Sequence, residues 1–228
     1  MSTLSAELPL VNRRILLAVT GSVAACKCDR IIRELEDMGA TVQVLLTDNG
    51  ARFFSPETAG ALTSEPVLQN QFDSTEPGEM AHITAKQRTD CILVAPATAN
   101  RLLQIPSPQA SDTLGTVLQA FSGPVLYAPA MNPDMWDDPT VQSICSEHSS
   151  EIVTPEAGTM ACGETGPGRL PDPAQIVEFV VDYLWPEPLK GKSVAVSSGP
   201  TREPWDQVRF LSNRSSGKMG EAVAKMGA

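Results

Sequence analysis

Short apolar runs alternate with amphipathic segments along most of this chain. The first run covers residues 15–20 and is followed by Gly21 and Ser22, an amphipathic segment over 23–38, and a glycine stop at Gly39. Four further apolar runs follow at 41–47, 91–95, 124–128 and 152–154. Uninterrupted runs suit strands that are buried on both faces, and strands separated by helices form parallel sheets with right-handed crossovers. The pattern therefore predicts an α/β fold with a doubly wound parallel sheet and helices on both faces.

This pattern ends at a proline-broken polar stretch. A candidate helix over 174–183 precedes Pro186 and Pro188, and residues 193–198 then have the character of a new strand. Prolines among polar residues are typical of a linker. One strand and part of a helix cannot bury a core. We therefore expect a complete domain over 12–185, a linker over 186–192, and the truncated start of a second domain over 193–228.

Composition and charge favour a cytoplasmic protein with a small-molecule ligand. The formal net charge of -10 disfavours a general nucleic-acid surface. No apolar run approaches the roughly 20 residues of a membrane span, and the N-terminal stretch has no basic leader. The five cysteines form no CxxC pair and are accompanied by only two histidines, so we expect no metal site. Reduced thiols are the expectation in a cytoplasm.

The turn after the first apolar run suits an anionic ligand. Gly21 and Ser22 lie at the start of the first helix, where free backbone N–H groups and the positive end of the helix dipole hold a phosphate. The dinucleotide fingerprint GxGxxG is absent. A mononucleotide phosphate and an ordinary turn with a serine cap are both compatible with this segment.

Two further strand ends carry small or polar residues. Thr98 and Asn100 follow the third run, where they suit either a planar ring or a plain capped turn. Asn132 follows the fourth run, inside a proline-flanked segment over 129–136. Ligands collect at the carboxyl ends of strands in open α/β sheets, so this amide is placed like a working residue.

His82 and Cys162 are the candidates for proton chemistry. His82 precedes a helical stretch that leads to Asp90, and a reference pKa of about 6.5 suits an acid, a base or a carboxylate partner. Cys162 lies in a glycine-rich loop, which suits a flap that closes over a ligand and presents a thiol as a proton donor. A satisfied structural histidine and a surface loop with an incidental thiol are the alternatives, and the pair could also suggest a thiol nucleophile.

Together these segments resemble the flavin-containing cysteine decarboxylases. The resemblance rests on Thr20-Gly21-Ser22, on His82, and on the segments 129–135 and 161–169, and it covers roughly residues 12 to 185. It implies a flavodoxin-like (Rossmann-like) fold, bound FMN, and a homotrimer, often assembled into dodecamers, with active sites between subunits. The closest resemblance within the family is to the branch that acts on 4'-phosphopantothenoylcysteine in coenzyme A biosynthesis.

The resemblance also implies a role for each matching residue. It places the FMN phosphate at Gly21 and Ser22, with Thr47, Thr98 and Asn100 near the flavin or its side chain. It makes His82, Asn132 and Cys162 the catalytic residues, and it puts Met135 and Arg169 beside Asn132 on the substrate. No metal ion takes part.

The implied reaction is an oxidative decarboxylation that yields 4'-phosphopantetheine. Direct loss of CO₂ from the cysteine carboxylate would leave an unstabilised carbanion, so oxidation to a thioaldehyde comes first and reduction of the resulting enethiol comes last. Asn132 suits the carboxylate because a neutral amide donates hydrogen bonds and then releases CO₂. Cys162 supplies a proton in the final reduction.

The C-terminal segment resembles the opening of a phosphopantothenate-cysteine ligase domain. The resemblance rests on residues 198–204 and 212–220, with Asn213 and Lys218 at ligase positions. A complete ligase would use CTP and Mg²⁺. Because only its start is present, we expect no ligase activity.

Two segments depart from the decarboxylase pattern, and alternative functions remain open. The helix after His82 lacks the family's usual tryptophan or basic-aromatic run. After Asn100 the family usually continues as a glycine- or alanine-rich helix, whereas this chain has a proline-containing stretch over 103–114. A prenyl-FMN synthase-like flavin transferase would lack the Asn132 and Cys162 motifs. A non-catalytic regulatory flavoprotein subunit would usually have lost a motif histidine, asparagine or cysteine, and all three are present. A plain nucleotide-binding module would be colourless.

Overall fold

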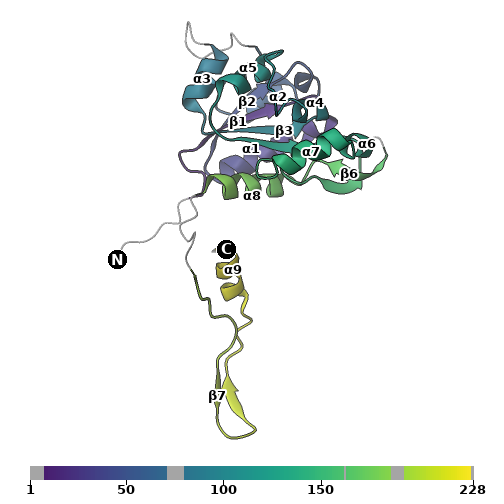
Figure 1. The fold of residues 1–228 in the computed structure, drawn as a ribbon. Coiled ribbons are helices and arrows are strands. Elements are labelled where there is room, and N and C mark those ends of the chain that lie inside the picture. Colours follow the sequence, from purple (N-terminus) through teal and green to yellow (C-terminus); the bar gives the residue numbers. More distant parts are fainter. Residues whose placement is uncertain (1–7, 71–79, 162, 186–192, 227–228) are drawn as a thin grey trace. The chain divides into compact units, whose positions relative to one another are not determined.

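The computed structural model describes residues 8–70, 80–161, 163–185 and 193–226, and the chain divides into two compact units after Trp185 (Figure 1). The first unit contains a four-stranded parallel sheet with the strand order β2-β1-β3-β4. The strands are β1 (Arg14–Val19), β2 (Thr41–Leu46), β3 (Cys91–Ala97) and β4 (Val125–Pro129). The order reverses between β1 and β3, as in flavodoxin-like sheets, which confirms the predicted fold class.

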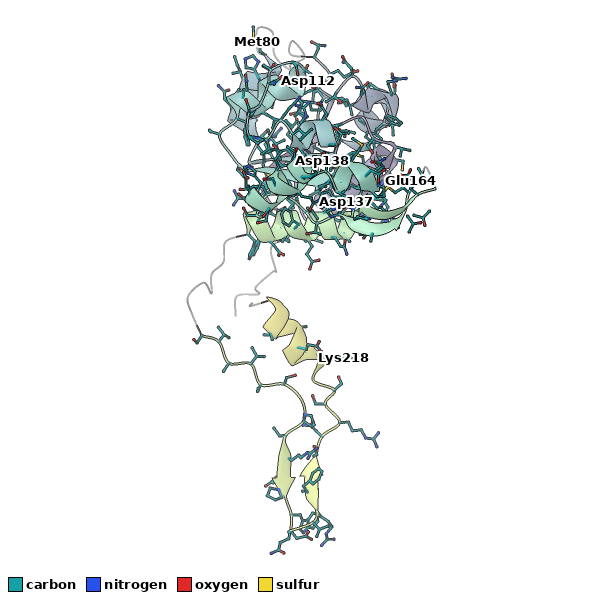
Figure 2. All side chains as sticks on the ribbon, turned by 45° about the vertical axis from the view of Figure 1, so that its right-hand side comes forward. Met80, Asp112, Asp137, Asp138, Glu164 and Lys218 are labelled. Atoms are coloured by element: carbon teal, nitrogen blue, oxygen red, sulfur yellow. The ribbon has the colours of Figure 1, made fainter. Side chains whose placement is uncertain are left out.

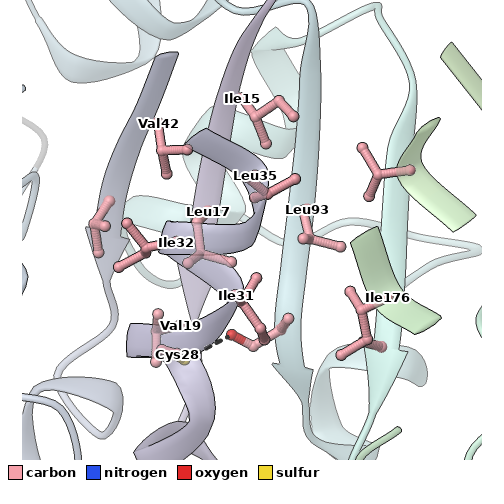
Figure 3. Close-up of a cluster of buried hydrophobic side chains, with 14 of the residues drawn as sticks. Ile15, Leu17, Val19, Cys28, Ile31, Ile32, Leu35, Val42, Leu93 and Ile176 are labelled. Carbon is pink, nitrogen blue, oxygen red and sulfur yellow. Dashed lines mark hydrogen bonds between the residues drawn. The ribbon is translucent and has the colours of Figure 1, made fainter. Parts of the chain in front are cut away.

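Helices cover both faces of this sheet. One face packs against α1 (Cys28–Asp37), α2 (Pro56–Leu62) and α8 (Pro173–Leu184), and the other against α4 (Ala99–Leu102), α5 (Thr113–Ala120) and α7 (Pro139–Glu147). The apolar side chains of α1 recur with helical spacing and face β1 and β3; Figure 3 shows them as Cys28, Ile31, Ile32 and Leu35. Alternate side chains of β1 point to opposite faces of the sheet, so this strand packs against both helix layers.

The predicted helix over 23–38 is divided. A short 3-10 helix, η1 (Val23–Lys27), precedes α1, and Ser22 caps its start by accepting a hydrogen bond from the N–H of Ala24 at 3.3 Å. The predicted helix over 174–183 is confirmed as α8. The remaining helices of the first unit are η2 (Gly50–Arg52), α3 (Ala81–Arg88) and α6 (Pro133–Trp136).

The predicted fifth parallel strand over 152–154 is wrong in extent. Only Ile152 forms a bridge, parallel to Tyr127 of β4. Pro155 lacks the N–H that would continue the ladder. The chain turns there into an antiparallel hairpin of β5 (Glu156–Thr159) and β6 (Thr165–Arg169), which the sequence did not predict.

The second unit consists of a hairpin and a helix. Antiparallel β7 (Arg202–Pro204) and β8 (Phe210–Ser212) are followed by α9 (Lys218–Met226). The predicted strand over 193–198 is wrong, because these exposed residues pair with no other strand among the described residues. Within the described parts of both units, no helix has the length and apolarity that crossing a bilayer requires.

Candidate functional site

The carboxyl ends of β1 and β3 meet at the point where the strand order reverses. The Thr20 hydroxyl donates a hydrogen bond of 2.6 Å to the carbonyl oxygen of Pro96 and accepts one of 3.3 Å from the N–H of Thr98. Thr20 is 3% exposed, so this hydroxyl is committed to joining the two strand ends. It leaves the Gly21-Ser22 turn beside the Thr98–Asn100 turn, at the position where open α/β sheets bind ligands.

Thr47 joins β2 to the same edge. Its hydroxyl donates to the carbonyl oxygen of Val19 at 3.1 Å and accepts from the N–H of Gly50 at 3.0 Å. Thr47 is 8% exposed. Its side chain therefore already has two partners within the protein, and the expected contact between Thr47 and the cofactor stays a prediction.

Two glycines allow the loops at this edge to approach each other closely. A Cβ atom on Gly21 would lie 2.5 Å from the Cβ of Asn49, and one on Gly50 would lie 2.2 Å from the carbonyl oxygen of Val19. Any side chain at these positions would force the loops apart. The Gly21-Ser22 turn is therefore held as a narrow backbone surface at the start of η1, which suits a phosphate.

Thr98 and Asn100 remain available for a ligand. Thr98 is the N-cap residue of α4, but its side chain makes no capping hydrogen bond. Asn100 is exposed, and neither side chain has a hydrogen-bond partner among the described residues. One hydroxyl and one amide, without a partner in the described part of the chain, thus lie at the strand edge beside the Gly21-Ser22 turn. This donor set fits the polar groups of a flavin mononucleotide.

Asn132 lies at the end of β4 with its amide held in a fixed orientation. Its Oδ1 atom accepts a hydrogen bond of 2.9 Å from the N–H of Met135, which makes it the N-cap residue of α6. Pro133 follows at the first position of that helix, where proline is pre-organised. The side-chain NH₂ group has no acceptor among the described residues, so Asn132 presents two free N–H donors.

The β5–β6 hairpin packs directly on the Asn132 segment. The N–H of Met131 donates to the carbonyl oxygen of Gly168 at 2.9 Å. Gly168 has a φ of +102°, and a Cβ atom there would lie 2.6 Å from the carbonyl oxygen of Met131. Gly166 makes a similarly close approach to Pro133, at 2.7 Å from its Cγ. These glycines explain part of the glycine-rich pattern, because the hairpin could not lie against the amide without them.

The base of this hairpin is tied to the first helix by Lys27, which sequence reasoning missed. Lys27 Nζ donates to the carbonyl oxygen of Leu170 at 3.0 Å. Partial burial lowers the pKa of Lys27, and repulsion from Arg169 adds to the effect. Arg169 is half-exposed and its Nε lies 4.0 Å from Glu156 Oε2. The only signal of Lys27 in the sequence was its position shortly after the Gly21-Ser22 turn.

The other predicted site residues are placed as follows. Met135 is 47% exposed beside Asn132. His82 lies in α3 and is partly buried, and its Nδ1 is buried without a partner among the described residues. Helices α3 and α6 lie on opposite sides of the first unit, and Figure 2 shows Met80, just before α3, far from Asp137 at the end of α6. A single chain therefore does not bring His82 to Asn132.

Three further predicted residues are Cys162, Asn213 and Lys218, and their roles, like those of the other site residues, stay predictions. Cys162 lies outside the described residues, in the sequence between β5 and β6. Asn213 and Lys218 are exposed in the second unit, where Asn213 Oδ1 accepts a hydrogen bond of 3.0 Å from the N–H of Ser215. Lys218 begins α9.

Comparison with known protein families gives two matches. Residues 3–184 match the Flavoprotein family, and residues 189–228 match the DNA/pantothenate metabolism flavoprotein C-terminal domain. The coenzyme A biosynthesis bifunctional protein CoaBC of Vibrio vulnificus is 39% identical over 219 residues, which is 95% of this chain and 55% of that protein. CoaBC of Bacillus subtilis is 40% identical over 222 residues. The chain thus spans about half the length of these curated relatives.

Solved structures share the fold of the first unit. The FMN binding protein AtHal3 has a TM-score of 0.60 at 25% identity, with 74% of this chain and 95% of that chain covered. The FMN-dependent cysteine decarboxylase SpaF has a TM-score of 0.61 at 25% identity, covering 74% and 97%. A PPC decarboxylase mutant complexed with pantothenoylaminoethenethiol has a TM-score of 0.63 at 24% identity, covering 74% and 96%.

Proposed function

Because this chain belongs to the CoaBC-like flavoproteins, we propose that its first unit is an FMN-dependent decarboxylase of 4'-phosphopantothenoylcysteine that yields 4'-phosphopantetheine. The observation that carries the proposal is the Asn132 amide. It lies at the end of a sheet strand, its oxygen is used by α6, and its two N–H donors have no acceptor in the part of the chain that the structure describes. A carboxylate is the acceptor that such a pair of donors suits.

The residues at the strand edge would hold the cofactor. The backbone of the Gly21-Ser22 turn suits the FMN phosphate, while the unpaired side chains of Thr98 and Asn100 suit the flavin or its side chain. Thr47 would shape this site by holding Gly50 close to β1. When bound, FMN supplies the capacity to take two electrons from the cysteine moiety of the substrate and to return them after CO₂ has left.

Asn132 would bind the departing carboxylate. Its cap bond to Met135 fixes the amide before the substrate arrives, so little side-chain entropy is lost on binding. A neutral amide also holds the carboxylate less tightly than an arginine would, which leaves CO₂ free to depart. Met135, which lies in α6, and Arg169, which ends β6, are proposed to contact the rest of the substrate.

The hairpin would bring the proton donor. Cys162 lies in sequence between β5 and β6, and β6 packs on Met131 and Pro133 through Gly168 and Gly166. A thiol carried by that hairpin would reach the substrate over Asn132. We assign Cys162 the delivery of a proton to carbon when the enethiol product of decarboxylation is reduced.

His82 would complete the site from a second copy of the chain. Its helix lies on the opposite side of the unit from Asn132, and its Nδ1 has no partner among the described residues. A homotrimer or a larger assembly with sites between subunits would unite the two residues. The reaction would belong to the cytoplasm, where a thiol substrate stays reduced.

For the second unit we propose a ligase-type role. Its match to the pantothenate-metabolism C-terminal domain supports Asn213 and Lys218 as ligase-type residues, and the relatives that share both parts are bifunctional proteins of coenzyme A biosynthesis. A ligase reaction there would require CTP and Mg²⁺.

The visible spectrum is the first test. The purified chain should be yellow, with an absorption band at about 450 nm that is released on denaturation as FMN. Thr98→Val combined with Asn100→Ala should weaken FMN binding, whereas Thr154→Val, at an exposed position outside the site, should not. A colourless protein that cannot be reconstituted with FMN would contradict the cofactor assignment.

Turnover is the second test. The FMN-loaded chain should convert 4'-phosphopantothenoylcysteine into 4'-phosphopantetheine and CO₂, as followed by mass spectrometry. Cys162→Ser should release CO₂ and accumulate the enethiol, while Cys26→Ser, which alters an exposed thiol, should turn over normally. Full turnover by Cys162→Ser would remove this thiol from the mechanism, and no turnover by the wild-type chain would overturn the substrate assignment.

A further inference from the structure

Arg101 is a buried charged side chain next to the proposed cofactor site. It is 4% exposed and lies in α4, directly after Asn100. Burying a guanidinium is unfavourable unless it is paired and hydrogen-bonded. Its burial therefore needs a structural reason, and the residues proposed to bind the cofactor and the substrate do not provide one.

The guanidinium is bound to two partners beyond α4. Nη2 lies 2.5 Å from Asp112 Oδ2, and Nη1 donates to Gln104 Oε1 at 2.8 Å. Nε is also buried and has no partner among the described residues. Both Nη atoms of the planar group are thus held, so the side chain forms a rigid link between α4 and Asp112.

Asp112 passes this restraint to α5. It is the N-cap residue of that helix, and its Oδ1 accepts a hydrogen bond of 2.6 Å from the N–H of Gly115. One carboxylate therefore starts α5 with one oxygen and pairs with Arg101 through the other. The connection between α4 and α5 contains Pro106 and Pro108 and no regular helix, so it cannot transmit the position of one helix to the other by itself.

Helix α5 packs in turn against α3, which carries His82. Figure 1 shows the two helices side by side, and Figure 2 shows Asp112 on the same side of the unit as Met80, just before α3. A continuous set of contacts therefore runs from the Thr98–Asn100 turn through Arg101 and Asp112 to the histidine helix.

We propose that Arg101 is a positioning residue that keeps the Thr98–Asn100 turn and the His82 helix in a fixed relation through its pair with Asp112. The inference rests on the proposed function, because it gives the cofactor-side turn and His82 their roles. Arg101 touches neither the substrate nor the cofactor in this account.

Three variants test the charge of Arg101, its ion pair with Asp112 and its two-pronged hydrogen bonding separately. Arg101→Met keeps an apolar stem of similar length and removes the charge. Asp112→Asn keeps an oxygen to cap α5 and removes the ion pair, because asparagine caps as well as aspartate. Arg101→Lys keeps the charge but loses the two-pronged geometry. Arg30→Met is the matched control, since Arg30 is 54% exposed and pairs with Glu34 and Asp172 on the surface of α1.

The variants are measured as the full chain loaded with FMN, at a temperature well below their melting points. Arg101→Met and Asp112→Asn should lower kcat by about tenfold or more with little change in KM, since small misplacements of catalytic groups have effects of this size. Both should weaken FMN binding, and Arg101→Lys should fall between them and the wild type. Arg30→Met should match the wild type in kcat, in KM and in FMN affinity.

Hydrogen exchange gives a readout that does not depend on activity. Amides of α3 and α5 should exchange faster in Arg101→Met and Asp112→Asn than in the wild type, while those of α1 and α8 stay protected. A lower melting temperature with wild-type kcat, FMN affinity and α3 exchange would show a purely structural role and overturn the proposal. A wild-type chain without turnover would defeat the proposed function, whereas the exchange of α3 and α5 would still decide whether Arg101 positions them.

Discussion

The Thr20 hydroxyl and the Pro96 carbonyl oxygen, 76 residues apart in sequence, lie 2.6 Å apart and join the carboxyl ends of β1 and β3. The same hydroxyl accepts a hydrogen bond from the N–H of Thr98. One buried oxygen atom therefore sets the separation between the Gly21-Ser22 turn and the Thr98–Asn100 turn. The geometry of the candidate cofactor site therefore depends on a side chain that need not touch the cofactor.

Thr20→Val should destabilise the first unit and weaken FMN binding. Valine matches threonine in shape, but it leaves the Pro96 carbonyl and the Thr98 N–H without this partner in a buried place, which costs about 1–3 kcal/mol per unsatisfied group. Urea denaturation and FMN titration measure the two effects. Thr154→Val, at an exposed position, should change the unfolding free energy by less than about 0.5 kcal/mol. Equal midpoints for both variants would contradict the role of Thr20.

Gly168→Ala should displace the β5–β6 hairpin from the Asn132 segment. The added Cβ would lie 2.6 Å from the Met131 carbonyl oxygen at a φ of +102°, and strain of this kind costs about 1–3 kcal/mol. We expect a lower melting temperature and slower decarboxylation. Gly60→Ala is the control, because its Cβ would meet nothing closer than 3.7 Å and alanine favours the α2 helix. A Gly168→Ala protein with wild-type melting and turnover would show that the hairpin accommodates the methyl group.

The sheet could be predicted because its signals are local. The run at 15–20 is apolar up to Thr20, the run at 41–47 is broken only by Gln43, and both end in glycine or polar turns. These local features predict β1 and β2 without knowledge of the rest of the chain. The order of the strands at the sheet edge then places Gly21, Thr98 and Asn132 on the same side, since all three follow the carboxyl ends of parallel strands.

The β5–β6 hairpin and the segment 193–198 could not be predicted in this way, because strand formation there depends on a pairing partner. Residues of β5 and β6 are exposed or half-buried, apart from the buried Gly168, and they are rich in glycine. They therefore lack the apolar pattern of a strand, and their pairing is visible only once the chain has folded back. The segment 193–198 has that apolar pattern but finds no neighbour among the described residues. Apolar alternation indicates a strand only when a second strand can satisfy its backbone groups.

The roles of Thr47 and Arg101 were hidden for a related reason. The hydroxyl of Thr47 is used by Val19, 28 residues away, and the guanidinium of Arg101 by Asp112 across an irregular loop. A polar residue after a strand has the same pattern in the sequence whether it faces a ligand or braces the strand edge. Only its hydrogen bonds distinguish the two.

Alkaline pH should destabilise the first unit through its buried thiols. Burial raises the pKa of Cys91 from 9.0 to about 12, so the folded state keeps a proton that the unfolded state releases. The contribution of this thiol to the free energy of unfolding is fully present below pH 9, the pKa of the thiol in the unfolded state. It is lost at about 1.4 kcal/mol per pH unit as pH rises toward 12. Burial also raises the pKa of Cys28, which acts in the same direction.

Urea midpoints measured across this alkaline range would check the effect. Cys91→Ala should show a shallower loss of stability with pH than the wild type, after allowance for its lower stability at neutral pH. Cys26→Ala removes an exposed thiol and should keep the wild-type slope. Parallel slopes for wild type and Cys91→Ala would show that other groups cause the alkaline loss.

Asn132→Asp should separate the capping role of this residue from its proposed role toward the substrate. Aspartate retains an oxygen that accepts the Met135 N–H and caps α6 as well as asparagine does, so the melting temperature should stay close to that of the wild type. The NH₂ group, however, is replaced by a negatively charged oxygen that would repel the substrate carboxylate, and we expect kcat/KM to fall by about 100-fold or more. Asp134→Asn makes the reverse exchange at an exposed position of the same helix and should retain activity within about twofold. An Asn132→Asp enzyme that decarboxylates at the wild-type rate would mean that the carboxylate is bound elsewhere, because no acceptor-only side chain can replace the two N–H donors.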